Sequence, residues 1–108
     1  MASKKISRSR ELAAKTIFAA FQILKENDGE MKGSDVVNQI PDRVDLDEWA
    51  KERYEKTGYI RWESILHFFS IDCIKAGYLV KKSGVWYLTE EGEESLKLGP
   101  VELLNSAQ

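Results

Sequence analysis

A single long segment, from Ile60 to Ala76, constrains the fold of this chain more than any other. Its apolar residues recur with the period of an α-helix, and one face of that helix holds Trp62, Ile65, Leu66, Phe69 and Cys73. The opposite side is polar and holds Glu63, Ser64, His67 and Ser70. Because three more apolar residues lie outside the first face, we expect the helix to be enclosed or to pack against a second partner; they are Phe68, Ile71 and Ile74.

A β-hairpin is predicted directly after this helix. Gly77 suits the left-handed position that commonly ends a helix. The segments 78–82 and 85–89 are rich in β-branched and aromatic residues, and the pair Ser83-Gly84 joins them. Thr89 can cap a further helix, and the helix dipole favours the glutamates that follow in its first turn.

Three helices are predicted before the long segment. The first is capped by Ser9 and ends at an Asn-Asp-Gly turn. The second is short and is stopped by Pro41. The third begins at Asp45 or Asp47 and ends near Gly58, and its charges alternate in sign as on a solvated helix face.

The order of these elements predicts a mainly helical α+β fold. It is consistent with a winged helix-turn-helix, in which the helix at 60–76 is the recognition helix and the hairpin is the wing. A chain of 108 residues supports one compact domain. We place that domain at residues 9–98, after a flexible basic arm at 1–8. Residues 99–108 are expected to be a C-terminal tail or linker, with room for one or two more helical turns.

The net charge of −2 argues against a protein that coats nucleic acid through bulk positive charge. The charge is unevenly distributed, because the N-terminal arm and the hairpin region are locally basic whereas residues 89–108 are acidic. The sequence therefore allows a positively charged surface that could bind a polyanion, but this surface is small.

Nothing in the sequence indicates a membrane or secreted protein. No apolar run is long enough to span a bilayer, and the N-terminus lacks the apolar core of a signal peptide. Cys73 is the only cysteine, which excludes an intrachain disulfide and favours a cytoplasmic location. Its apolar neighbours predict a buried and unreactive thiol.

The sequence also lacks the patterns that mark a catalytic chain. It has no phosphate-binding loop, no nucleophile with a nearby base and no cluster of metal ligands. The one histidine, His67, has no partner at metal-site spacing. We therefore expect a binding module without cofactor or metal, and not an enzyme.

Two motifs carry a resemblance to a known family. Ile74-Lys75-Ala76-Gly77 ends the long helix, and Ser-Gly-Val-Trp-Tyr-Leu-Thr-Glu-Glu-Gly follows from Ser83. Together with the Thr57-Gly58 pair ahead of the helix, these residues resemble the N-terminal domain of Mrr-type restriction proteins. The resemblance extends from about Ile17 to Leu96. Such proteins are modification-dependent DNA endonucleases that carry a winged helix ahead of a separate nuclease domain.

The resemblance implies a module that reads DNA. In the family such a module belongs to a longer chain with a nuclease domain, and this sequence has no segment that corresponds to the nuclease. The chain departs from the family pattern in the recognition helix. The family commonly has an Asn-Arg pair followed by a Trp, where this sequence has Ser64-Ile65 and then Phe68. The missing arginine removes a candidate contact to phosphate or base, which Arg61 and His67 could replace.

A helix-turn-helix reaches base edges with the exposed start of its recognition helix, and flanking residues contact phosphates. Around the helix start this rule selects Thr57, Tyr59, Arg61, Glu63, Ser64 and His67. At the wing tip it selects Lys81, Lys82 and Ser83, and in the arm Lys4, Lys5 and Arg8. The alternative for each group is an ordinary solvated helix start, turn or terminus.

Three functions remain open. The leading hypothesis is the recognition module of a restriction-type protein, which binds double-stranded DNA, plain or methylated, as a monomer or weak homodimer. The second is a free-standing transcription regulator, whose dimer could form through the face of Phe68, Ile71 and Ile74. The third is a winged helix that binds protein, with which the acidic isoelectric point is compatible.

Overall fold

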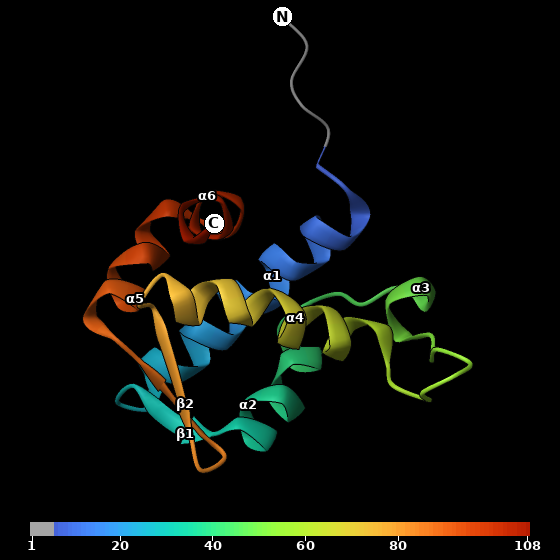
Figure 1. Cartoon of the computed structure of the whole chain (residues 1–108), viewed down its shortest axis with the longest axis horizontal. Helices are drawn as coiled ribbons and strands as arrows, with labels where there is room; N and C mark the ends of the chain where they lie inside the picture. Colours follow the sequence, from blue (N-terminus) through green and yellow to red (C-terminus); the bar gives the residue numbers. More distant parts are fainter. Residues whose placement is uncertain (1–5) are drawn as a thin grey trace, which may run out of the picture.

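The computed structural model describes residues 6–108, whose path Figure 1 follows from blue to red. The elements are α1 (Arg8–Glu26), β1 (Glu30–Lys32), α2 (Gly33–Gln39), η1 (Ile40–Asp42), α3 (Glu48–Lys51), α4 (Arg61–Lys75), β2 (Leu79–Lys82), β3 (Val85–Leu88), α5 (Glu90–Ser95), η2 (Leu96–Leu98) and α6 (Pro100–Ala107). The fold is mainly helical α+β, as predicted, with one antiparallel sheet in the order β1-β3-β2. None of the helices within residues 6–108 is both long and apolar enough to cross a membrane.

Helix α1 forms the centre of the core. The alanines of its buried face are small, so other helices can approach it closely. Figure 1 shows α4 crossing α1, and α6 also packs against it. Leu66 of α4 and Leu103 and Leu104 of α6 are fully buried in this core. The sequence left open whether residues 99–108 form a linker or further helical turns. The structure shows that they form helical turns, because α6 packs into this core.

Strand β3 lies in the middle of the sheet and pairs antiparallel with both β1 and β2. The turn between β2 and β3 consists of Ser83 and Gly84, with φ of 52° and 79°. Positive φ at both positions is what a two-residue turn between twisted strands requires, so the predicted hairpin is confirmed. The sequence did not predict β1, because three residues are too few to show the periodicity of a strand.

Trp86 of β3 joins the sheet to the helices beside it. Its side chain is buried, and a Cβ added at Gly33 would collide with its indole nitrogen, so only glycine at the start of α2 leaves room for the ring. On the side of α4 the ring meets His67 edge to face, with the centroids 5.9 Å apart. The position of the hairpin relative to α4 therefore depends on this one side chain.

Thr89 joins the end of α4, the hairpin and the start of α5. Its hydroxyl donates to the Gly77 carbonyl oxygen at 2.6 Å and accepts from the Gly92 backbone N–H at 3.0 Å, as the predicted N-cap. Its own backbone N–H donates to the Tyr78 carbonyl oxygen at 3.1 Å. A Cβ added at Gly92 would collide with that same oxygen. The two motifs that carry the family resemblance are thus physically connected.

The start of α1 differs from the prediction. Ser7 caps the helix instead of Ser9, because the Ser7 hydroxyl accepts from the Arg10 backbone N–H at 3.1 Å. Arg8, which the sequence placed in the basic arm, is consequently the first residue of α1.

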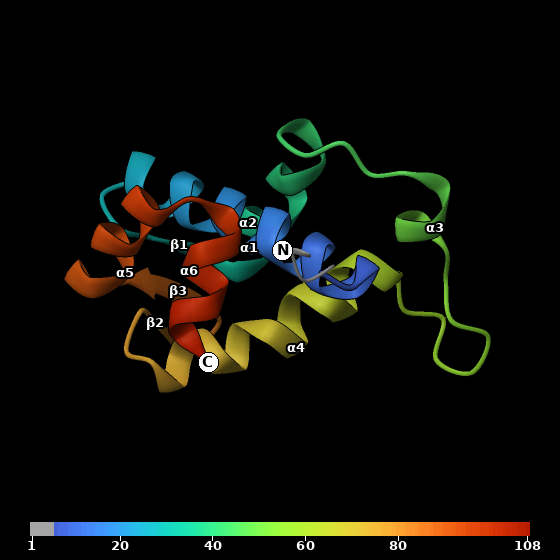
Figure 2. The ribbon, with the colours of Figure 1, turned by 90° about the horizontal axis from the view of Figure 1, so that it is seen from above.

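Helix α3 is much shorter than predicted. It begins after the Asp47 cap, one of the two predicted caps, but ends at Lys51. Residues 52–60 then turn back on themselves, and the Gly58 backbone N–H donates to the Tyr54 carbonyl oxygen at 2.8 Å. Gly58 has a φ of 74°, which permits this reversal. Figure 2 shows the resulting loop extending from α3 and α4, away from α5.

We expect Gly92→Ala to destabilise the fold. The added Cβ would collide with the Tyr78 carbonyl oxygen, which cannot move without disturbing the Thr89 cap. The free energy of unfolding should therefore fall by about 1–3 kcal/mol, the usual cost of an overpacked site. Urea unfolding followed by tryptophan fluorescence measures this value. The control is Glu91→Ala, an exposed neighbour; if both variants were as stable as the wild type, the close approach at Gly92 would be wrong.

Candidate functional site

The start of α4 and the loop before it form a surface hollow. Residues from both segments line it, namely Arg53, Gly58, Tyr59, Ile60, Glu63, Ser64 and His67. Its volume of about 650 Å³ lies within the range of small-ligand sites. The structure therefore brings together four of the six residues that the sequence nominated around the helix start.

Three polar side chains of this hollow have no polar partner within the described residues. Glu63, Ser64 and His67 make no side-chain hydrogen bond or ion pair with any other residue of the described range 6–108. Tyr59 is 66% exposed. The hollow thus presents a carboxylate that accepts hydrogen bonds, a hydroxyl and an imidazole that can donate or accept them, and an aromatic ring.

Arg61 is engaged elsewhere. Its guanidinium donates to the Trp49 carbonyl oxygen at 2.7 Å and to the Glu52 carboxylate at 2.6 Å, and it lies 4.7 Å from the centroid of the Trp49 ring. Arg8 lies 4.3 Å from the same centroid and pairs with Asp47 at 2.9 Å. Two arginines that the sequence nominated for DNA contact are therefore held in one network around Trp49, which ties the starts of α1, α3 and α4 together.

Lys81 lies against α4 and not at the free tip of the hairpin. Its Nζ donates to the Ser70 hydroxyl oxygen at 2.8 Å and lies 4.3 Å from the centroid of the Trp86 ring. Ser70 is therefore buried, although the sequence placed it on the polar side of the helix. Burial lowers the pKa of Lys81. Burial, and secondly the charge of Lys81, lower the pKa of His67.

The other nominated residues lie in three places. Lys82 and Ser83 are exposed at the hairpin turn. Thr57 is exposed in the loop before α4, where its hydroxyl accepts from the Tyr59 backbone N–H at 3.2 Å. Lys4 and Lys5 lie outside the described residues. For all of these, contact with DNA stays a prediction.

Sequence reasoning did not include Arg53 and Ile60 in the site. The Arg53 guanidinium donates to the Gly58 carbonyl oxygen at 2.7 Å, and the Arg53 backbone pairs with Ile60 in an isolated β-bridge. Residues 52–60 were predicted to continue α3, and a helix there would not place Arg53 and Ile60 beside each other at the start of α4. The available signal was Gly58, since a glycine next to a helix start commonly marks a turn.

Three apolar residues are exposed on the outward face of α4, beside the exposed His67 and Lys75. Phe68 is 68% exposed, Ile71 48% and Ile74 39%. The sequence left open whether these three residues belong to the core or to an interface. In the structure the core lies on the other face of the helix, so they are available for contact with a partner.

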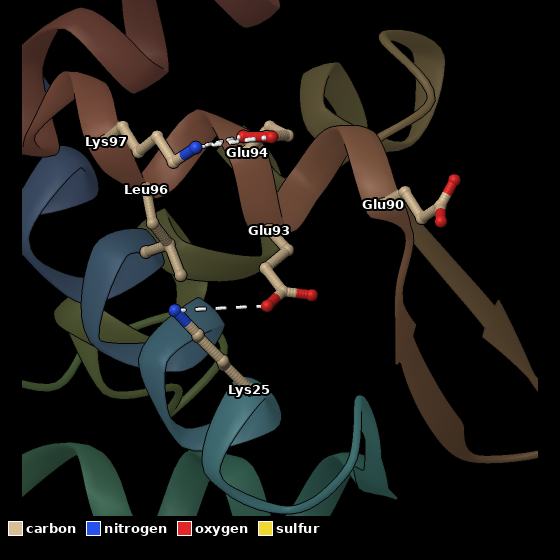
Figure 3. A pocket seen from close by; sticks show the side chains of 6 residues that line it. All are labelled: Lys25, Glu90, Glu93, Glu94, Leu96 and Lys97. Atoms are coloured by element: carbon tan, nitrogen blue, oxygen red, sulfur yellow. Dashed lines mark hydrogen bonds and ion pairs between the residues drawn. The ribbon is translucent and has the colours of Figure 1, made fainter.

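A second hollow, beside α5, is lined by ion pairs. Lys25 lies 3.9 Å from the Glu93 carboxylate, and Lys97 lies 2.8 Å from the Glu94 carboxylate. Figure 3 shows that the Glu90 side chain points away from both pairs. The hydrogen bond from Lys97 lowers the pKa of Glu94. No group of three or more His, Cys, Asp and Glu residues within 6–108 could hold a metal ion. This hollow is therefore a weaker candidate than the one at α4.

Comparison with protein families supports a common origin for most of the chain. A family model described as the Mrr N-terminal domain matches residues 14–98. The matched range includes both the hollow at α4 and the Thr89 junction. No curated protein and no solved structure matches the chain.

The titration of His67 tests the cluster around Trp86. His67 is the only histidine, so its ring protons can be followed by NMR without overlap. We expect a pKa below about 6.5, the ordinary value. Because the unfolded chain then binds the proton more readily than the folded one, stability should be full above that pH and should fall as the pH drops toward the lowered pKa.

Two lysine variants serve as a matched pair for this titration. Lys81→Gln should raise the pKa of His67, because it removes a nearby positive charge, whereas Lys82→Gln at the exposed turn should leave it unchanged. An equal effect of the two variants would exclude a specific contribution from Lys81.

Arg61→Ala should loosen the loop before α4. The substitution removes the hydrogen bonds to Trp49 and Glu52, so the amides of residues 47–60 should exchange faster with deuterium, as mass spectrometry can measure. Lys56→Ala, in the same loop but exposed, is the control and should leave the exchange rates unchanged. Unchanged exchange in Arg61→Ala would show that the network does not hold the loop.

Proposed function

The chain belongs to the Mrr N-terminal domain family, and from this premise we propose that it is a winged helix-turn-helix module that binds double-stranded DNA. In this proposal α2 and α4 form the helix-turn-helix, α4 is the recognition helix, and the β2–β3 hairpin is the wing. The order α1, β1, α2, η1, α3, α4, β2, β3 supports the assignment, with η1 and α3 in the connection between the two helices. So does the contact of Trp86 with His67, which sets the hairpin directly beside α4.

The observation that carries the proposal is that three polar side chains at the start of α4 have no hydrogen-bond or ion-pair partner within residues 6–108. The arginines Arg8, Arg43 and Arg61 are paired with carboxylates, whereas Glu63, Ser64 and His67 have no partner within residues 6–108. Base edges in the major groove present both donors and acceptors. A carboxylate can accept from a base amino group, and a hydroxyl or neutral imidazole can donate to a ring nitrogen or carbonyl oxygen.

Contacts to the phosphate backbone would come from the lysines around this helix. Lys82 and Ser83 are exposed on the turn of the proposed wing. Lys81 has no acidic partner within the described part of the chain, so its charge is not neutralised internally. In this proposal Lys4 and Lys5 extend the footprint along the DNA. With a net charge of −2, the isolated module should bind modestly and respond steeply to salt.

The biological setting that we propose is recognition of DNA, plain or methylated, for a restriction-type protein. The module would act in the cytoplasm as a monomer or weak homodimer, and cleavage would be done by a nuclease domain of a longer parent chain. No cofactor or metal is needed for reading DNA in this way.

A second candidate function is contact with protein. The observation that favours it is the exposed apolar face of α4, because groove-reading helices contact a polar surface, whereas Phe68, Ile71 and Ile74 would be better covered by another apolar surface. A free-standing dimeric regulator and a protein-binding winged helix would both use such a face. DNA affinity separates a protein-binding winged helix from a DNA-reading module, whereas light scattering separates a tightly dimeric regulator from a monomeric module.

Fluorescence polarisation with short labelled duplexes, plain and methylated, tests the DNA proposal. We expect binding at low salt, with the logarithm of the association constant falling linearly as the logarithm of the salt concentration rises. Lys82→Gln should reduce the magnitude of this slope by about 0.9, the contribution of one lost phosphate contact.

The control for this measurement is Lys97→Gln. It removes the same charge from the segment beside α5, where Lys97 pairs with Glu94, and should leave the slope unchanged. If neither duplex binds at low salt, or if both lysine variants act alike, DNA reading by this surface is wrong and protein contact becomes the better function.

A further inference from the structure

We propose that the hollow at α4 receives one unstacked DNA base that carries an amino group, with Tyr59 as the stacking surface and Glu63 as the acceptor. Extrusion of the base from a duplex rests on the proposed function, whereas the fit of a nucleobase to the hollow does not. A base inside a duplex lies in a groove and is reached by side chains that project from the protein. A hollow of about 650 Å³ has the inverse shape and admits a group that projects from the DNA, as an extruded base does.

One wall of the hollow is a single face of α4. Ile60 directly precedes the helix, and the other lining residues follow it by three, four and seven positions, which is the spacing of one helix face. These residues are Glu63, Ser64 and His67. Their side chains form no hydrogen bond or ion pair within residues 6–108, so no internal partner competes with a ligand for them.

The opposite wall is the loop before α4, and hydrogen bonds hold its backbone. The Tyr59 carbonyl oxygen accepts from the Tyr54 backbone N–H at 3.0 Å, and the Tyr59 backbone N–H donates to the Thr57 hydroxyl at 3.2 Å. The Tyr59 backbone is thus fixed while its residue is largely exposed. This is what a stacking surface requires, and because every base has a π-face, stacking on the ring supplies affinity and not base preference.

Glu63 supplies the base preference. A carboxylate accepts hydrogen bonds but does not donate them, so it attracts an amino group and repels a carbonyl oxygen at the same place. Cytosine has an amino group where thymine has a carbonyl oxygen. Cytosine also has acceptor atoms to which the Ser64 hydroxyl and the His67 imidazole can donate. Burial, and secondly the charge of Lys81, lower the pKa of His67, so the ring is neutral at pH 7.

Arg53 can bind the phosphate of the extruded nucleotide. Unlike Arg8, Arg43 and Arg61, it has no acidic partner among the residues that the structure describes. Its guanidinium donates to the Gly58 carbonyl oxygen at 2.7 Å, but a guanidinium has five N–H donors, and phosphate oxygens are favoured acceptors for the rest. Because Arg53 lines the same hollow, the base and the phosphate of one nucleotide fit a single site.

Titration with deoxycytidine monophosphate tests the hollow without a duplex. His67 is the only histidine and lines the hollow, so its ring protons should show a saturable NMR shift. Deoxythymidine monophosphate should bind at least about fivefold more weakly, because it lacks the amino group. The absence of a shift, or equal affinity for the two nucleotides, would overturn the proposal.

Two variants of Tyr59 separate stacking from other contributions. Tyr59→Ala should weaken the binding of deoxycytidine monophosphate at least about fivefold, because it removes the stacking ring. Tyr59→Phe keeps the ring and should bind as the wild type does. Equal affinities of the two variants would exclude stacking on this residue.

The role of Glu63 is tested by the preference between the two nucleotides. Glu63→Gln should abolish the preference for cytosine, because an amide can donate to the thymine carbonyl oxygen as well as accept. Glu91→Gln removes the same charge at an exposed position of α5 and should keep the preference. An unchanged preference in Glu63→Gln would overturn the assignment of Glu63 as the acceptor.

Fluorescence polarisation with matched duplexes tests extrusion. One duplex has a fully paired cytosine, and in the other the same cytosine lies opposite an abasic site. An unpaired base costs less to extrude, so the wild type should bind the second duplex at least about tenfold more tightly. An unpaired thymine at the same position should give no such gain. Equal affinity for the two cytosine duplexes would overturn extrusion.

The two kinds of experiment distinguish failure of this proposal from failure of DNA reading. If deoxycytidine monophosphate binds in the hollow but no duplex binds, the nucleotide site stands and the proposed function fails. If duplexes bind but the nucleotide does not shift the His67 signals, DNA reading stands and the site for an unstacked base is wrong.

Discussion

The burial of Trp86 is the contact on which the relation between the sheet and α4 depends. Its ring lies against the backbone of Gly33, meets His67 edge to face and lies beneath the Lys81 ammonium group. One side chain therefore sets the positions of α2, α4 and the hairpin relative to one another. The absence of a side chain at Gly33 is part of this arrangement, since even a methyl group there would displace the ring.

The distribution of paired and unpaired charges decides what the surface around α4 can do. Arg61 and Arg8 carry guanidinium groups near that surface, but these groups hold Trp49 and the loop before α4. Exposed ion pairs contribute little to stability, so the effect of these arginines is chiefly to position the loop. In the proposed function, DNA would therefore be contacted by Glu63, Ser64 and His67 in the hollow and by the lysines of the hairpin.

Much of the fold could be predicted from local sequence patterns. The period of apolar residues in α4, the two-residue turn of the hairpin and the Thr89 cap are all determined by residues close together in the chain. The predictions failed where distant residues compete with local preference. Residues 52–60 have the alternating charges of a helix, but Arg61 holds Glu52 and Gly58 reverses the chain, so α3 stops early.

For the candidate site, the sequence by itself determined which chemical groups lie near the start of α4, because Tyr59, Glu63, Ser64 and His67 follow one another at helical spacing or just before it. Only the tertiary structure decided which of the nearby groups are free. Whether an arginine is available depends on the carboxylates and aromatic rings that folding brings beside it. In the same way, the exposure of Phe68, Ile71 and Ile74 was decided by which face of α4 packs on α1, and periodicity alone does not determine that face when most of a helix is apolar.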